Sequence, residues 1–219
     1  GLSDTFKKEL HEYLEGQGFK DDEVGILSMN MGPNAFATSL FGYRQVILTK
    51  ELVTSYPDPA NPDFIMDLDD NTLQSIVAHE VGHIKNRHIE KSILLGTFIS
   101  SVVTVLVYHL FSANPSEYMV FAKSTSQQIL LYWGQSIFNV MLMYPLTFFM
   151  LYRTRRNEDE ADMHMLTTCV CKNAKDFFHQ IRHIAPVKNL PLWHSCNMSH
   201  PAPHIREKRS IEWEKEHCK

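Results

Sequence analysis

The residues of this chain best suited to chemistry are His79, Glu80 and His83, which form an HExxH pattern in the segment HEVGH. Two histidines four residues apart point from one face of a helix, about one turn apart, and can supply two ligands of a tetrahedral zinc ion. Glu80 then lies beside the metal without ligating it, which suits a general base for the attacking water. The pattern predicts a metallopeptidase centre with one Zn2+ per chain.

A tetrahedral site of this kind needs a third protein ligand. The metzincin continuation requires a glycine at position 86 and a histidine at position 89, but the chain has Asn86 and Ile89, which excludes that class. His88 follows His83 by five residues and is rotated from it by about 140° on a continuous helix. We therefore expect His88 to be a solvated or juxtamembrane histidine.

Acidic residues gather in the run NEDEADMH at 157–164. On a helix Glu158 and Asp162 share a face, so Glu158 could bind the zinc while Asp162 accepts a hydrogen bond from a ligand histidine and orients its ring. Glu160 and His164 have the same spacing and form a rival pair. A charged helix start without a ligand role is the third alternative.

Apolar periodicity and helix breakers predict the elements that position these residues. We expect helices over 3–15 and from 70 or 71 to about 91, with strands over 24–29 and 44–48. Between the strands, Asn34, Ala35, Phe36 and Ala37 could form an extended segment of their own. The segment 56–62 is rich in proline and cannot sustain a helix or a central strand, so we expect a loop there.

Two apolar blocks predict a membrane-embedded chain. Residues 93–111 contain no formally charged side chain, which is close to the roughly 20 residues needed to cross a bilayer, and 129–152 form a second, more polar block. We expect a two-helix transmembrane hairpin that returns the acidic run to the HExxH side. The alternative is a soluble peptidase with two buried apolar helices, which would be extracted without detergent.

Charge and cysteine distribution narrow the possible partners. Lys and Arg lie mainly outside the two ends of the hairpin, which places the catalytic flanks on the cytoplasmic side. The net charge of −4 offers no basic surface, so we expect no nucleic-acid partner. The chain has no CxxC pair, so we expect neither a zinc ribbon nor a disulfide framework. Its four cysteines are Cys169, Cys171, Cys196 and Cys218. No signal peptide follows Gly1, so we expect a processed end or a fragment boundary there.

HEVGH followed by RRNEDEADMHML closely resembles the membrane zinc peptidases that include bacterial HtpX and the type I CAAX prenyl proteases. In that family the Glu of an ExxAD motif is the third zinc ligand, which implies Glu158 rather than Glu160. The resemblance also implies that the segment Asn34, Ala35, Phe36, Ala37 lies along the substrate cleft as an edge strand. It further implies that His200 and Arg206, from an HPxxxxR segment, support the catalytic centre.

The expected fold is mainly α with a small β-sheet. A zincin-like catalytic domain made of 1–91 and 153–219 is interrupted by the transmembrane hairpin at 92–152. The expected function is zinc-dependent hydrolysis of peptide or membrane-protein substrates at a lipid bilayer, in membrane-protein quality control.

Two other functions rank lower. Prenyl-protein processing is second, because the upstream transmembrane helices of the larger prenyl proteases are not in this chain. A catalytically silent membrane scaffold is third, because the HExxH residues and Glu158 are intact. The endoplasmic reticulum, the bacterial inner membrane and the mitochondrial inner membrane are equally compatible with the sequence, and a mitochondrial quality-control branch of the superfamily stays open as a relative.

Overall fold

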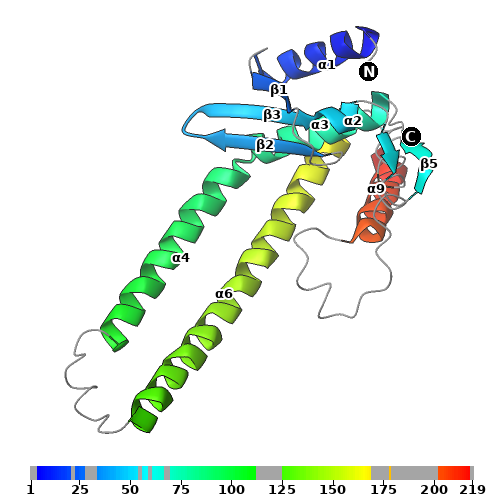
Figure 1. Cartoon of the computed structure of the whole chain (residues 1–219). Helices are drawn as coiled ribbons and strands as arrows, with labels where there is room; N and C mark the ends of the chain where they lie inside the picture. The colour runs from blue at the N-terminus through cyan, green and yellow to red at the C-terminus, as the bar shows by residue number, and fades with distance from the viewer. Residues whose placement is uncertain are drawn as a thin grey trace.

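The protein has a small body of helices and strands at one end of two long helices (Figure 1). The structure, a computed structural model, describes residues 4–20, 23–27, 34–53, 56–58, 61–66, 70–111, 125–168, 178 and 202–217. The described part is mainly helical with a small mixed sheet, as the sequence predicts.

The main sheet has three strands, β1 (Val24–Leu27), β2 (Ala35–Leu40) and β3 (Tyr43–Thr49), in the order β1-β3-β2. β1 runs parallel to the central β3, and β2 runs antiparallel to it. The β2–β3 hairpin turns through Phe41 and Gly42, which both have positive φ. β2 is therefore an edge strand, and it begins with the residues expected to be extended.

A second, two-stranded sheet lies where the sequence predicts a loop. β4 (Tyr56–Asp58) pairs antiparallel with β5 (Asn61–Met66), so the prediction of a loop over 56–62 is wrong for the residues of both strands. Both strands of a two-stranded sheet are edges, and an edge strand can tolerate a proline that lacks an N–H donor. The register is irregular next to Pro57, which is where such a residue fits.

The core of the body is formed between α1 (Asp4–Gly16), the main sheet, the short α2 (Lys50–Val53) and α3 (Asp70–Lys85). Its buried side chains are apolar: Leu10, Leu14, Phe19, Val46, Leu48, Leu52, Leu73, Val77, Val81 and Ile84. These contacts hold one face of α3 against the sheet. The opposite parts of α3 remain available for contacts with other helices.

α3 ends earlier than expected. The prediction of one helix to about Lys91 is wrong, because the chain turns at Asn86 and Arg87 and starts a new helix, α4 (His88–Phe111). Arg87 has a φ of 53°, in the left-handed region that cannot continue a helix. The backbone N–H and the side-chain amide of Asn86 both donate to the carbonyl of Gly82 and close the last turn of α3.

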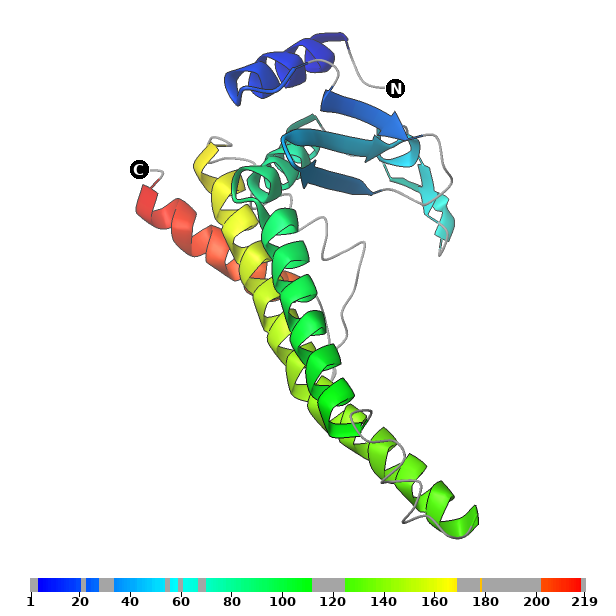
Figure 2. The same ribbon diagram turned by 90° about the vertical axis from the view of Figure 1, so that its left-hand side faces the viewer.

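The two long helices, α4 and α6 (Thr125–Thr168), project together from the body (Figures 1 and 2). Apolar side chains on both are exposed, for example Leu94 at 70%, Leu130 at 77% and Met141 at 70%. The alternative of two apolar helices buried in a soluble core is therefore wrong. Within the described residues, one stretch is long and apolar enough to span a membrane, His88–Leu106, with 19 residues.

α6 is one continuous helix that carries both the second apolar block and the acidic run 157–164. Pro145 lies inside it. The C-terminal α9 (Pro203–His217) packs against α6 near the body. Because α3 also packs on α6, the HExxH residues and the acidic run come from two helices in direct contact.

Candidate metal centre

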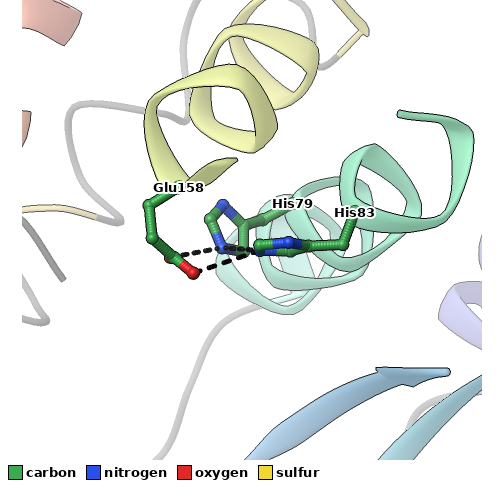
Figure 3. Close-up of side chains that lie close together, drawn as sticks. All are labelled: His79, His83 and Glu158. Atoms are coloured by element: carbon green, nitrogen blue, oxygen red, sulfur yellow. Dashed lines mark hydrogen bonds and ion pairs between the residues drawn. The ribbon is translucent and has the colours of Figure 1, made fainter. Parts of the chain in front are cut away.

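His79 and His83 of α3 and Glu158 of α6 point toward one another (Figure 3). The Nε2 atoms of the two histidines are 3.2 Å apart, and the Glu158 oxygens lie 3.3 Å from His79 Nε2 and 3.4 Å from His83 Nε2. Three ligands at the usual Zn–N and Zn–O distances, placed on a tetrahedron, would be about 3.3 Å from one another. The donor set therefore fits zinc in both chemistry and spacing.

The close approach of α3 and α6 depends on Gly82. A Cβ placed on Gly82 would lie 3.0 Å from the Cα of Ala161, 3.0 Å from the Cβ of His164 and 3.1 Å from the carbonyl oxygen of Ala161. Ala161 is fully buried. A larger side chain at position 82 or 161 would push Glu158 away from the histidines. The small residues of the HExxH and ExxAD motifs therefore allow the close packing of α3 and α6.

A buried ion pair lies behind His79. The Nδ1 of His79 is 2.9 Å from Asp162 Oδ1, on the side of the ring opposite the metal-facing Nε2. Arg206 of α9 donates from Nε to Asp162 Oδ2 at 2.7 Å and from Nη2 to Oδ1 at 2.5 Å. Its guanidinium also lies over the ring of Phe178, 5.0 Å from the centroid. Arg206 therefore contacts the centre through Asp162, not at the metal-binding point.

Comparison with known proteins places the chain in a family. Residues 4–211 match Peptidase family M48. The chain belongs to that family. This confirms the membership expected from the HExxH and ExxAD motifs, which lie within the matched residues.

Two known proteins similar to the chain agree with this membership. A protein named protease HtpX homolog, from Picrophilus torridus, is 28% identical over 140 residues, which are 61% of this chain and 39% of that protein. The crystal structure of S. mikatae Ste24p has a TM-score of 0.66 and 21% identity, and the match covers 95% of this chain and 51% of that one. The chain thus spans about two fifths of the HtpX homolog and about one half of Ste24p. The likeness to Ste24p concerns the fold alone.

The two histidines of this candidate centre differ in the direction in which their surroundings shift the pKa. Burial would lower the pKa of His79, but its hydrogen bonds with Asp162 and Glu158 outweigh burial and raise the pKa to about 9. Burial and the neighbouring His79 lower the pKa of His83 to about 4. In the metal-free protein at neutral pH, a proton on His79 thus supplies the positive charge that the surrounding carboxylates favour.

The surroundings of Asp162 favour its charged form. Burial would raise the pKa of Asp162, but the hydrogen bonds from His79 and Arg206 lower it overall. Glu80 is half-buried on α3, and its negative charge also helps raise the pKa of His79. Glu80 is therefore close to the ligand histidines, as the expected role of general base requires.

Of the two alternatives expected for His88, a solvated histidine is wrong, and a juxtamembrane histidine stays a prediction. Only 2% of His88 is exposed, and its Nδ1 lies 3.0 Å from His83 Nδ1. Its Nε2 lies 3.1 Å from Glu160 Oε2. The rival pair is thereby divided, because Glu160 faces His88 while His164 lies against Gly82, and neither belongs to the converging donor set. Asn86 could have indicated the helix break, because Asn, like Gly, often ends a helix, but no residue type indicates that the break turns His88 inward.

The segment expected to bind substrate lies on the edge strand. Ala35, Phe36 and Ala37 are the first residues of β2, which contacts both α3 and α4. Asn34 precedes the strand, and its N–H donates to Thr49 Oγ1 at 2.8 Å. The remaining predicted residues, His200 and the four cysteines, lie outside the described residues.

Proposed function

We propose that this chain is a zinc-dependent membrane endopeptidase. The observation that carries the proposal is the convergence of His79, His83 and Glu158 with the edge lengths of a zinc-ligand tetrahedron. Membership of Peptidase family M48 supports the same activity. The name of the relative from Picrophilus torridus, a protease HtpX homolog, also supports it.

In this proposal the residues of the chain divide the work. Zinc, when bound, acts as a Lewis acid on the scissile carbonyl and makes water a better nucleophile. Glu80 takes a proton from the attacking water and passes it to the leaving amine. Asp162, held by Arg206, fixes the ring of His79 so that Nε2 faces the metal. β2 is an edge strand of the main sheet, so a substrate strand could pair with it by backbone hydrogen bonds, beginning at Ala35.

We also propose the domain division made from the sequence: catalytic parts at 1–91 and 153–219 and a transmembrane hairpin at 92–152. The candidate span His88–Leu106 and the exposed apolar surface of α6 beside it support the hairpin. The basic residues outside its two ends support a cytoplasmic location of the centre. Membrane-protein substrates are favoured, because β2, the strand proposed to bind substrate, contacts α4 where that helix leaves the body.

The mutation Glu80→Gln tests the catalytic proposal. Gln keeps the size of the side chain but cannot accept the proton, so casein cleavage by the detergent-purified protein should fall by about 10² to 10⁴-fold. Zinc content should stay at one ion per chain. The variant Glu9→Gln, at an exposed site on α1, is the matched control and should cleave like the parent.

The outcomes separate peptidase from scaffold. A parent that binds zinc but cleaves no peptide would support the silent scaffold, and a Glu80→Gln protein that cleaves at the parental rate would refute the mechanism. Prenyl-protein processing remains the second candidate for the substrate. Cleavage of a prenylated CAAX peptide in preference to casein would favour it.

A further inference from the structure

The inward-facing His88 connects a zinc-binding histidine to a surface carboxylate. His88 lies between His83, 3.0 Å away on its Nδ1 side, and Glu160, 3.1 Å away on its Nε2 side. The rings of His83 and His88 meet edge to face, with centroids 5.0 Å apart. Glu160 is 40% exposed at its side chain and also accepts from Arg156 Nε at 3.3 Å. The contacts thus form a chain from α6 to the metal-facing histidine of α3.

The turn between α3 and α4 is what makes this chain possible. On an unbroken helix, a residue five positions after His83 would project about 140° away from it. The left-handed backbone at Arg87 reverses that direction and places His88 at the first position of α4. Asn86 stabilises the turn through its two hydrogen bonds to Gly82.

The hydrogen-bonding needs of the three groups determine where the protons lie. His83 presents Nε2 to His79 and Glu158, so a neutral ring that binds metal there carries its proton on Nδ1. His83 Nδ1–H then donates to His88 Nδ1, which must be unprotonated. A neutral His88 consequently carries its proton on Nε2 and donates it to Glu160, which is a carboxylate acceptor.

We propose that His88 is a positioning residue that, with Glu160, fixes the tautomer and ring orientation of His83. The inference rests on the proposed zinc site. His88 and Glu160 would hold the ring of His83 by hydrogen bonds, as Asp162 and Arg206 hold the ring of His79. The two ligand histidines would then be held by separate carboxylates of α6, Asp162 directly and Glu160 through His88.

A merely structural buried histidine is the competing explanation, and two substitutions at position 88 separate the two. His88→Phe keeps an aromatic ring but leaves the N–H of His83 without an acceptor, so zinc affinity, measured by competition with a chelator, should fall by about 10 to 100-fold. His88→Gln retains one acceptor and one donor in the amide, so it should keep zinc affinity close to that of the parent.

Val46→Ala is the matched control for loss of stability. Val46 is fully buried in β3 within the core that packs against α3, and its apolar side chain is not a member of the hydrogen-bonded chain of His83, His88 and Glu160. It should lower the melting temperature of the protein without changing zinc affinity. If His88→Phe behaves in the same way, with parental zinc affinity, or if His88→Gln binds zinc no better than His88→Phe, the positioning role is refuted.

A second measurement needs no substitution at position 88. Long-range ¹H–¹⁵N spectra of the zinc-loaded parent, labelled with ¹⁵N-histidine, should show His83 protonated on Nδ1 and His88 protonated only on Nε2. A His88 protonated on Nδ1 would overturn the proposal. Failure of the parent to bind zinc would instead refute the proposed function, because the inference predicts only how zinc affinity depends on His88.

Discussion

Replacing Gly82 with alanine tests whether the contact between α3 and α6 sets the geometry of the metal centre. The added Cβ would lie 3.0 Å from both Ala161 Cα and His164 Cβ. Carbon atoms in contact prefer about 3.5 to 4.0 Å, so α6 must move away from α3 by about 0.5 Å or more. The backbone of α6 cannot rotate aside as a flexible side chain could, and Glu158 lies one turn away on the same helix.

Metal binding is more sensitive to this displacement than stability is. Overpacking costs about 1 to 3 kcal/mol, and the better helix propensity of alanine offsets about 1 kcal/mol of it. The net loss of stability should therefore be small, a few degrees in melting temperature. Ligand distances in metal sites vary by only about 0.2 Å, so Gly82→Ala should weaken zinc binding by at least about tenfold.

The assay is chelator competition for zinc in detergent, together with thermal unfolding with and without the metal. Gly134→Ala is the matched control, because a Cβ on Gly134 of α6 meets nothing within 4 Å. It should leave zinc affinity unchanged. Equal zinc affinity of Gly82→Ala and Gly134→Ala would refute the argument that helix contact determines the site.

Three further predictions concern the groups around His79. The pKa of His79 is raised to about 9 and that of His83 is lowered to about 4, so zinc binding at pH 7 should release one proton, from His79. The apparent zinc affinity should therefore rise about tenfold per pH unit up to about pH 9. Calorimetry in buffers of different ionisation enthalpy measures the proton release, and zinc binding without proton release would contradict the assignment. The same raised pKa stabilises the metal-free protein fully below about pH 6.5, and this contribution should be lost as the pH rises through about 9, which thermal unfolding against pH will show. Arg206→Met should lower the free energy of unfolding by about 3 to 5 kcal/mol, because it leaves the charge of Asp162 buried with one partner fewer, whereas Asp162→Asn combined with Arg206→Met should cost less than Arg206→Met alone in chemical denaturation.

The sequence was most informative where the chemistry lies within one regular element. His79 and His83 could be assigned together because a helix imposes their shared face, and α3 begins at the expected Asp70. The strands around β3 followed from their apolar and β-branched residues. These predictions need no knowledge of how distant parts of the chain meet.

Contacts between elements were harder to predict. Spacing alone left Glu158 and Glu160 as rivals, since both stand one turn before a polar partner, and the family resemblance was needed to select Glu158. The inward position of His88 depends on a single left-handed residue, Arg87, and arginine does not signal such a backbone. The β4–β5 hairpin was missed because proline is read as a breaker even where a strand has a free edge.

Because α6 is one continuous helix, a bend in its apolar part moves Glu158 at the metal centre. Pro145, which removes a backbone hydrogen bond, lies 13 residues before Glu158, about 20 Å along the axis, so a bend of about 5° there would carry Glu158 by nearly 2 Å. That displacement far exceeds what a zinc ligand tolerates. In the proposed membrane arrangement, forces in the bilayer would tilt the part of α6 before Pro145. The tight packing of Gly82 against Ala161 would then hold Glu158 in place beside the two histidines.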